Sequence, residues 1–261
     1  VQSGNDASVA LAEHIAGSVE DFAVLMNKHA GTLKMADSNF VNAHGLPHAD
    51  HYTSARDMAR LAMALIERFP NYYRWHAKRE FEHNGIKQRN RNKLLWSDES
   101  VDGIKTGYTE AAGYCLVASA QRGGMRLVSV VMGSPSPKKR TKASKRLLDY
   151  GFKNFETHRL YGAAERISDV RVWQGDRQRL ALGLVDDLVV TIPRGDYQSL
   201  KANLELAERV MAPVARGAKQ GTLRISLDKE LLAERPLVGL IAVPQGSLWQ
   251  QLSDRARLMM Q

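Results

Sequence analysis

The sequence predicts an α+β domain followed by a small all-β domain and a C-terminal amphipathic helix. Three observations support this prediction: helical periodicity comes first, short β-rich runs with a hairpin signal follow from about residue 101, and later runs are broken by Gly and Pro. Helices that precede an antiparallel sheet are typical of the α+β class. We therefore expect domains over residues 1–157 and 158–246, and the tail helix over residues 247–261.

Helical spacing of apolar residues predicts three helices, over residues 6–16, 19–29 and 54–69. The third is the clearest, because Ser54 and Asp57 resemble a capping pair and Pro70 stops the pattern. Its apolar residues lie three and four apart: Met58, Leu61, Leu65 and Phe69.

The β-rich runs of the first domain are "VDGIKTGYT", "GYCLVASAQ" and "MRLVSVVMG". Arg122-Gly123-Gly124 separates the last two and is a hairpin signal. A helix follows over residues 138–152, with Leu147, Leu148 and Phe152 expected on its buried side. The second domain is expected to contain "RVWQG", "LALGLV", "DLVVTIPRG", "GTLRISLD" and "LVGLIAVPQG" as strands.

The tail places apolar side chains on one helical face, with Arg255 and Arg257 beside them; the apolar residues are Leu248, Leu252, Ala256, Met259 and Met260. Such a helix can lie on a membrane surface. It can equally pack on its own domain, an interpretation that the sequence alone slightly favours.

Composition narrows the function classes. The chain has 261 residues, 44% of them hydrophobic and 25% charged, as in globular proteins. An excess of 37 Lys and Arg over 28 Asp and Glu gives a net charge of +9, which favours anionic partners. No nucleic-acid-binding motif accompanies the basic stretch at 72–93, so we expect no nucleic-acid partner. Cys115 is the single cysteine, which leaves no internal disulfide.

Two triplets can carry chemistry. Lys105-Thr106-Gly107 lies in a β-rich run, where a strand edge can pair with a peptide and Lys105 and Thr106 can bind a carboxylate. Ser3-Gly4-Asn5 precedes a helix, where Ser3 could relay a proton and Asn5 could bind an amide. Taken alone, the second triplet is more typical of helix capping.

Together the triplets resemble the Ser-x-Asn and Lys-Thr-Gly motifs of the active-site-serine penicillin-recognising enzymes. The likeness extends through "VQSGNDASVALAEHIAGS", "NFVNAHGLPHADHYTSARDMARLA", "NRNKLLW" and "AGYCLVASAQRGGMRLVSVVMG". These segments are similar to the D-alanyl-D-alanine carboxypeptidases, which are low-molecular-mass penicillin-binding proteins. The resemblance implies a β-lactamase-like transpeptidase fold over about residues 1–155, followed by that subfamily's C-terminal domain.

The resemblance also implies roles for individual residues. Ser3 would pass a proton to the departing D-alanine, and Asn5 would bind the acyl side of the substrate. Lys105 would tune the electrostatics of the cleft. Lys105 and Thr106 would bind the terminal carboxylate. Gly107 has no side chain and would let the substrate peptide approach the strand. The other contributors would be Arg140 at the carboxylate, Arg91 at the rim and the Tyr108 N–H in the oxyanion hole, although relatives often have His at position 108.

The nucleophile of this family is the Ser of a Ser-x-x-Lys motif that lies upstream of Ser-x-Asn. The chain has two literal matches, Ser136 to Lys139 and Ser226 to Lys229, both after Lys-Thr-Gly and in the wrong context. We therefore expect that these residues lack the N-terminal portion with the nucleophile and its base.

His44, His48, Asp50 and His51 form the rival constellation, with spacing like that of metal ligands. The spacing fits no His-Glu-x-x-His signature, so a zinc peptidase is the weaker hypothesis and we expect no metal and no cofactor. The other histidines, His76 among them, have no sequence partner that suggests a function.

The function implied is a serine-type D-Ala-D-Ala carboxypeptidase, a hydrolase of cell-wall biogenesis and cell shape. Its partners would be the peptidoglycan stem peptide, β-lactams as covalent inhibitors, and a membrane surface bound through the tail helix. It would be periplasmic and peripherally attached to the cytoplasmic membrane. Two alternatives stay open: a β-lactamase, or a non-catalytic wall-binding module if the chain is complete.

Overall fold

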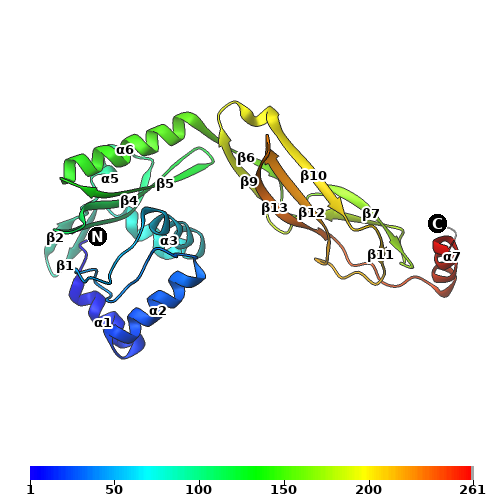
Figure 1. The fold of residues 1–261 in the computed structure, drawn as a ribbon, viewed down its shortest axis with the longest axis horizontal. Coiled ribbons are helices and arrows are strands. Elements are labelled where there is room, and N and C mark those ends of the chain that lie inside the picture. The colour runs from blue at the N-terminus through cyan, green and yellow to red at the C-terminus, as the bar shows by residue number, and fades with distance from the viewer. Residues whose placement is uncertain (260–261) are drawn as a thin grey trace. The chain divides into compact units, whose positions relative to one another are not determined.

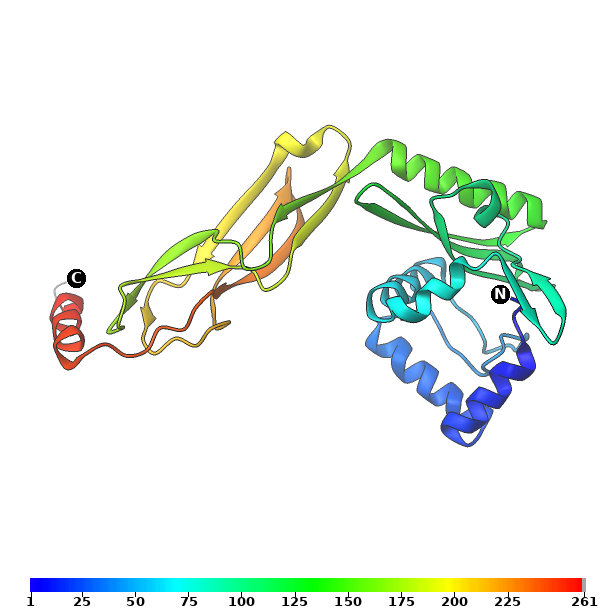
Figure 2. The same ribbon diagram turned by 180° about the vertical axis from the view of Figure 1, so that it is seen from behind.

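A computed structural model describes residues 1–259 of the chain. The chain divides into two compact units, Val1–Lys153 and Asn154–Gln261, which Figures 1 and 2 show from opposite sides. The first unit contains helices and antiparallel sheet, and the second is almost entirely β-sheet. The predicted α+β class followed by a β domain and a terminal helix is confirmed.

The helices of the first unit are α1 (Asn5–Ala16), α2 (Val19–Thr32), α3 (Ala55–Arg68), α4 (Pro70–Tyr73), the 3₁₀ turn η1 (Arg74–Ala77), α5 (Leu94–Ser97) and α6 (Pro137–Asn154). The capping prediction for α3 is confirmed, because the Ser54 side chain accepts the N–H of Asp57 over 3.2 Å. Pro70 ends this pattern and also opens α4, since proline fits the first helical turn. Of the predicted apolar stripe, Met58 and Leu65 pack in the core, whereas Phe69 is exposed.

The three predicted strands form one antiparallel sheet in the order β3-β4-β5, with bounds Val101–Thr109, Gly113–Arg122 and Met125–Ser134. Arg122 pairs with Met125 across the Gly123-Gly124 turn, which confirms the hairpin. A second hairpin, β1 (Glu80–His83) with β2 (Ile86–Arg89), lies in the basic stretch and was not expected. Each strand has only four residues, EFEH and IKQR, and a single large apolar side chain, too little for a clear strand pattern.

The sheet is buried on both faces, with α6 on one side and α3 on the other (Figure 1). Leu148 of α6 packs with Leu116 and Ala118, while Ala62 of α3 packs with Val117. The expectation that Leu147 is buried is wrong: its exposure is 49%. Leu147 lies about 100° around the helix from Leu148, so only one of these adjacent residues can point at the sheet.

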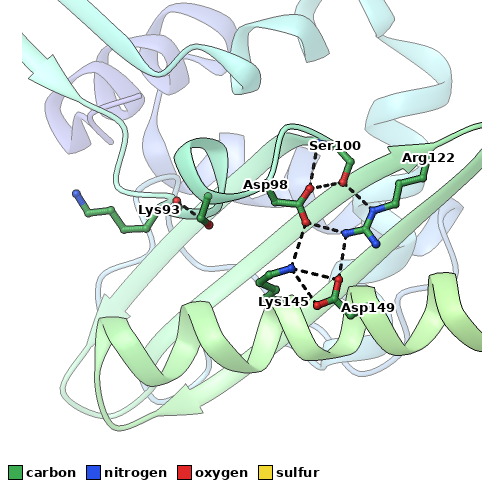
Figure 3. A network of polar contacts seen from close by, with 7 residues as sticks. Lys93, Asp98, Ser100, Arg122, Lys145 and Asp149 are labelled. Carbon is green, nitrogen blue, oxygen red and sulfur yellow. Dashed lines mark hydrogen bonds and ion pairs between the residues drawn. The ribbon is translucent and has the colours of Figure 1, made fainter.

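A polar network ties α6 to the end of β4 and to the turn before β3 (Figure 3). Arg122 donates from Nη2 to Asp98 over 2.8 Å and to Asp149 of α6 over 3.1 Å. Lys145 contacts both carboxylates, at 3.7 Å and 3.0 Å respectively. The Ser100 hydroxyl donates to Asp98 and accepts from Arg122, which completes the polar network.

The second unit contains a six-stranded sheet in the order β10-β12-β13-β8-β7-β11 and a separate pair, β6-β9. The strands are β6 (Phe155–Tyr161), β7 (Ser168–Trp173), β8 (Arg179–Gly183), β9 (Leu188–Pro193), β10 (Leu200–Leu206), β11 (Val210–Met211), β12 (Lys219–Leu227) and β13 (Glu230–Gly239), with a 3₁₀ turn η2 (Asp196–Ser199). Its core is one cluster of aliphatic residues, including Leu180, Leu182, Leu223 and Leu237. Strand β10 was missed, although Leu200, Ala202, Leu204 and Leu206 alternate with polar residues; most of the strand is exposed at the sheet edge.

The tail helix is α7 (Leu248–Met259), and Met260 of the expected apolar face lies outside the described residues. It docks on its own unit through Asp254, whose carboxylate accepts the N–H of Gln174 over 2.7 Å. Its apolar side chains do not take part in this docking, because Leu248, Trp249 and Leu252 are 77%, 82% and 57% exposed. The helix therefore contacts its own unit, as the sequence slightly favours, but through Asp254 and not through these exposed apolar residues. Among the described residues, no helix is both long and apolar enough to span a membrane.

Candidate active site

Lys105, Thr106 and Gly107 lie in the middle of β3, the strand at the edge of its sheet. Strand alternation leaves Lys105 and Gly107 exposed and buries Thr106 between them. The Lys105 ammonium donates to the carbonyl oxygen of Thr106 over 2.5 Å. A cation is thereby held over the backbone of the edge at which a peptide could add as a further strand.

Ser3-Gly4-Asn5 lies where the chain enters α1. Gly4 is the N-cap residue and no side chain caps this helix, so capping does not account for Ser3 or Asn5. Ser3 is exposed and has a positive φ of 67°, a conformation that is uncommon outside Gly and Asn. The charge of Lys105 acts at Val1, so this segment starts close to β3.

Two arginines complete a cluster of cations. Arg140 of α6 is only 5% exposed, and it donates to the carbonyl oxygens of Cys115 over 3.2 Å and Arg91 over 3.4 Å. Among the described residues, its buried Nε–H has no hydrogen-bond partner. Within residues 1–259, no carboxylate forms an ion pair with Arg140, Arg91 or Lys105. A cluster of unpaired cations attracts an anion, and a carboxylate matches the planar fork of arginine.

The charges of the two arginines act on Lys105. Partial burial lowers the pKa of Lys105, and the nearby charges of Arg91 and Arg140 lower it further. Burial also lowers the pKa of Arg140, which the neighbouring Cys115 and Tyr114 partly oppose. The structure therefore brings Lys105, Arg91 and Arg140 together, as a shared carboxylate site requires.

Tyr108 follows Gly107 and is 56% exposed. Its ring stacks on Tyr114 of β4 with a centroid distance of 4.2 Å, and the Arg140 guanidinium lies 5.9 Å from the Tyr114 ring. The side chain is thus turned onto the sheet, and the backbone N–H is the group left to act in an oxyanion hole.

Sequence reasoning missed the residues that hold this site in place. Asn90 and Asn92 are buried on either side of Arg91, with the side chain of Asn92 donating to the Gly103 carbonyl over 2.8 Å. His76 lies 3.0 Å from the carbonyl oxygen of Ile104, directly before Lys105. The "NRN" repeat was a signal for the asparagines, whereas nothing local could have linked His76 to β3, 28 residues away.

The histidine constellation does not form a metal site. In the described part of the chain, no three His, Cys, Asp or Glu side chains are arranged to hold a metal. Instead each imidazole accepts a backbone N–H through Nδ1: His44 from Leu46, His48 from Asp50 and His51 from Val41. The segment is a hydrogen-bonded turn that leads into α3.

The two literal Ser-x-x-Lys matches serve other purposes. The Ser136 hydroxyl accepts the N–H of Lys139 over 3.2 Å at the start of α6, as a helix cap does. Ser226 pairs with Lys201 and Leu231 inside the sheet of the second unit. Neither places a lysine ammonium beside its serine hydroxyl in a hydrogen bond within residues 1–259.

Comparison with known proteins identifies the family. The family model described as D-alanyl-D-alanine carboxypeptidase matches residues 1–136, just over half of the chain. The chain belongs to the D-alanyl-D-alanine carboxypeptidase family. The model described as penicillin-binding protein 5, C-terminal domain, matches residues 155–245, so the β-rich unit also has a counterpart in this group.

Individual members of the carboxypeptidase family match almost the whole chain. The D-alanyl-D-alanine carboxypeptidase DacA of Escherichia coli K12 is 44% identical over 261 residues, covering 99% of this chain and 65% of that protein. DacF of Bacillus subtilis is 37% identical, covering 91% of this chain and 62% of that protein. The chain thus spans less than two thirds of the length of these relatives.

Solved structures agree with the family assignment. Penicillin-binding protein 5 from Haemophilus influenzae superposes with a TM-score of 0.83 at 44% identity, covering 93% of this chain and 72% of that chain. Penicillin-binding protein D2 from Listeria monocytogenes, solved in a cefotaxime-bound form, gives a TM-score of 0.54 at 34% identity, covering 57% and 62%. The first comparison includes both units of the chain.

Proposed function

We propose that the full-length protein containing this chain is a serine-type D-Ala-D-Ala carboxypeptidase that removes the terminal D-alanine of peptidoglycan stem pentapeptides through an acyl-enzyme. The observation that carries this proposal is the cluster of Lys105, Arg91 and Arg140 beside the free edge of β3, with no carboxylate paired to it in residues 1–259. A peptide that adds to this edge would present its terminal carboxylate to these cations.

Each remaining residue has a place in that reaction. Lys105 and the Thr106 hydroxyl bind the terminal carboxylate, and Gly107 leaves room for the peptide backbone. The Tyr108 N–H stabilises the oxyanion of the tetrahedral intermediate, a contribution on the order of 10²–10³ in rate when one donor is removed. Asn5 binds the acyl-side amide, and Ser3 donates a proton to the departing amino group.

The attacking serine and its lysine base lie, in this proposal, outside these 261 residues. Two facts support this: both literal Ser-x-x-Lys matches serve as a helix cap or a paired strand residue, and the chain spans 65% of its Escherichia coli relative. The serine attacks the carbonyl of the penultimate D-alanine and forms an ester, and D-alanine leaves with a proton. Water then hydrolyses the ester. β-Lactams would acylate the same serine.

Full-length protein tests this proposal with an acyl-D-Ala-D-Ala peptide and with penicillin. We expect D-alanine release, a penicilloyl adduct in the intact mass, and slow loss of that adduct. Lys105→Ala should lower kcat/KM by about 10²-fold or more, and Lys87→Ala on the exposed hairpin β2 should not. Adduct loss in well under a second would indicate a β-lactamase instead, and no adduct with no D-alanine release would indicate a non-catalytic module.

We further propose that α7 attaches the protein to an anionic membrane surface on the periplasmic side of the cytoplasmic membrane. Its exposed residues Leu248, Leu252, Ala256, Met259 and Trp249 fall within an arc of about 100° at helical spacing. Arg255 and Arg257 flank this arc and suit anionic headgroups. Asp254, on another side of the helix, binds the β unit, so the arc is free to insert.

Vesicle binding of the unaltered chain tests the attachment. We expect co-sedimentation with vesicles of phosphatidylglycerol and phosphatidylethanolamine, with a blue shift of Trp249 fluorescence, and weaker binding to phosphatidylcholine alone. Leu252→Asp should abolish binding, and Ser253→Asp, one position away and outside the arc, should reduce it far less. Equal binding by both variants would contradict the proposed orientation.

A further inference from the structure

A side chain closes the free edge of β3 immediately before Lys105. The Nδ1–H of His76 donates to the carbonyl oxygen of Ile104 over 3.0 Å. The Nδ2–H of Asn92 donates to the carbonyl oxygen of Gly103 over 2.8 Å. In residues 1–259, β4 is the only strand that pairs with β3, so the Ile104 carbonyl is bound by a side chain where a further strand would otherwise bind it.

The direction of the Ile104 carbonyl defines which residues of β3 face the free edge. In an antiparallel strand, alternate residues direct both backbone groups to the same side. The register with β4 runs without interruption from Gly103 to Thr109. Thr106 and Tyr108 therefore face the free edge together with Ile104. A peptide that adds to β3 can pair with Tyr108 and Thr106, but its next pairing position, Ile104, is occupied by His76.

His76 is tightly packed against β3. A Cβ at Gly103 would lie 2.7 Å from Tyr73 Oη and 3.4 Å from His76 Cβ, so no space is left between the strand and these side chains. Tyr73 is 6% exposed and donates to Asp102 over 2.7 Å, and Asp102 pairs with Arg126 over 2.7 Å. The segment that carries His76 is therefore anchored to the sheet, and moving it away would break the hydrogen bond between Tyr73 and Asp102.

We propose that His76 ends the peptide-binding edge and makes the site select a free C-terminal carboxylate over a chain that continues. The inference rests on the carboxypeptidase function proposed above, in which the scissile carbonyl lies at the Tyr108 N–H and the carboxylate at Lys105 and Thr106. That polarity directs any residue beyond the carboxylate towards Ile104, where it meets His76. His76 is thus a specificity-determining residue that disfavours hydrolysis of internal D-Ala bonds, such as those in cross-linked peptides.

The test compares two substrates of the full-length protein, acyl-D-Ala-D-Ala and acyl-D-Ala-D-Ala-Gly. The second carries one residue past the position of the carboxylate and releases D-Ala-Gly on cleavage. In His76→Ala we expect the ratio of kcat/KM for the extended substrate over the short one to rise about fivefold, the gain from one backbone hydrogen bond of about 1 kcal/mol. His76→Gln keeps a donor for Ile104 and should retain the original ratio.

His83→Ala is the matched control, because His83 lies exposed on β1 and stacks on Phe81, away from β3. If His76→Ala does not fold, His76→Ser replaces it, because the serine side chain is too short to reach the Ile104 carbonyl. An unchanged ratio in folded His76→Ala or His76→Ser overturns this inference and leaves the carboxypeptidase proposal standing. Absence of hydrolysis of both substrates by the unaltered protein overturns both.

Discussion

The Arg140 guanidinium donates from Nη1 to the carbonyl oxygen of Cys115 over 3.2 Å, and Cys115 lies opposite Gly107 in the β3–β4 register. Helix α6 thereby brings a buried cation to the strand that carries Lys105. Arg140 and Lys105 are 35 positions apart in the sequence, and the packing of α6 on the sheet brings them together. The predictions below test what this arrangement and the contacts around it contribute.

Removal of Arg140 should weaken recognition of the substrate carboxylate. For Arg140→Ala we expect kcat/KM on acyl-D-Ala-D-Ala to fall about 10–100-fold, mainly through KM, because a hydrogen bond to a charged group contributes about 1.5–3 kcal/mol. Steady-state kinetics of the full-length protein measure this. Arg146→Ala, an exposed arginine of the same helix, is the control and should change little. Equal losses in both variants would refute the role.

The neighbouring cations should set the alkaline limit of activity. Burial first, and then the charges of Arg91 and Arg140, lower the pKa of Lys105 below its ordinary 10.5. Carboxylate binding needs the ammonium form, so activity should decline as the pH rises through this lowered pKa. Arg91→Ala removes one repulsive charge and should move the decline to higher pH, only slightly because Arg91 is exposed and its charge is screened.

The pH profile of kcat/KM measures this shift. Arg89→Ala is the matched control, since Arg89 lies on the exposed hairpin and pairs with Glu80 over 3.3 Å. Its alkaline limb should coincide with that of the unaltered protein. A limb that stays in place, or moves to lower pH, in Arg91→Ala would show that Arg91 does not act on Lys105.

Arg122 should stabilise the docking of α6 on the sheet. It bridges Asp98 and Asp149, and its guanidinium lies 4.4 Å from the Phe152 ring. The Asp98 side chain is only 10% exposed, so Arg122→Ala leaves a mostly buried carboxylate with weaker compensation. We expect about 1–3 kcal/mol less local stability, measured by hydrogen exchange in α6 and β4. Arg224→Ala, which removes two exposed ion pairs of the second unit, should cost less than about 1 kcal/mol per pair.

The same network should lose its contribution in acid. Burial raises the pKa of Asp98, but the Ser100 hydrogen bonds and Arg122 outweigh it, and the net pKa is lowered. Lys145 and Arg122 lower the pKa of Asp149. A lowered carboxyl pKa stabilises the fold above the unfolded value of about 3.9, and this stability disappears as the pH falls through the folded value. Acid unfolding of Arg122→Ala should therefore be less steep below about pH 4, and an identical slope would contradict this.

Asp254 should hold α7 against the β unit. The carboxylate accepts the N–H of Gln174 over 2.7 Å, and Asp254→Ala leaves that donor without a partner. We expect faster limited proteolysis between Gly246 and Leu248, at unchanged protection of β12. Ser253→Ala, exposed on the same helix, serves as the reference. Equal cleavage rates in the two variants would show that other contacts hold the helix.

Much of this molecule follows from the sequence because its signals are local. Period and capping predicted α3, the Gly123-Gly124 turn predicted the β4–β5 hairpin, and two triplets with their flanking segments identified the family. Short elements such as β1 escaped, because four residues carry too little hydrophobic pattern. Strand β10 was missed despite its alternating apolar residues. The proposed roles of Ser3, Asn5 and the Lys-Thr-Gly triplet remain predictions.

The sequence by itself determined the class, the order of elements and the residue types that can bind a carboxylate. The tertiary structure alone decided which of them meet: Arg140 with Cys115, His76 with Ile104, and Asp254 with Gln174, which are separated by 25, 28 and 80 residues. It also turned the apolar arc of α7 away from its own unit. The reason is physical: local propensity fixes each element, but side-chain packing and the burial of polar groups select which faces meet.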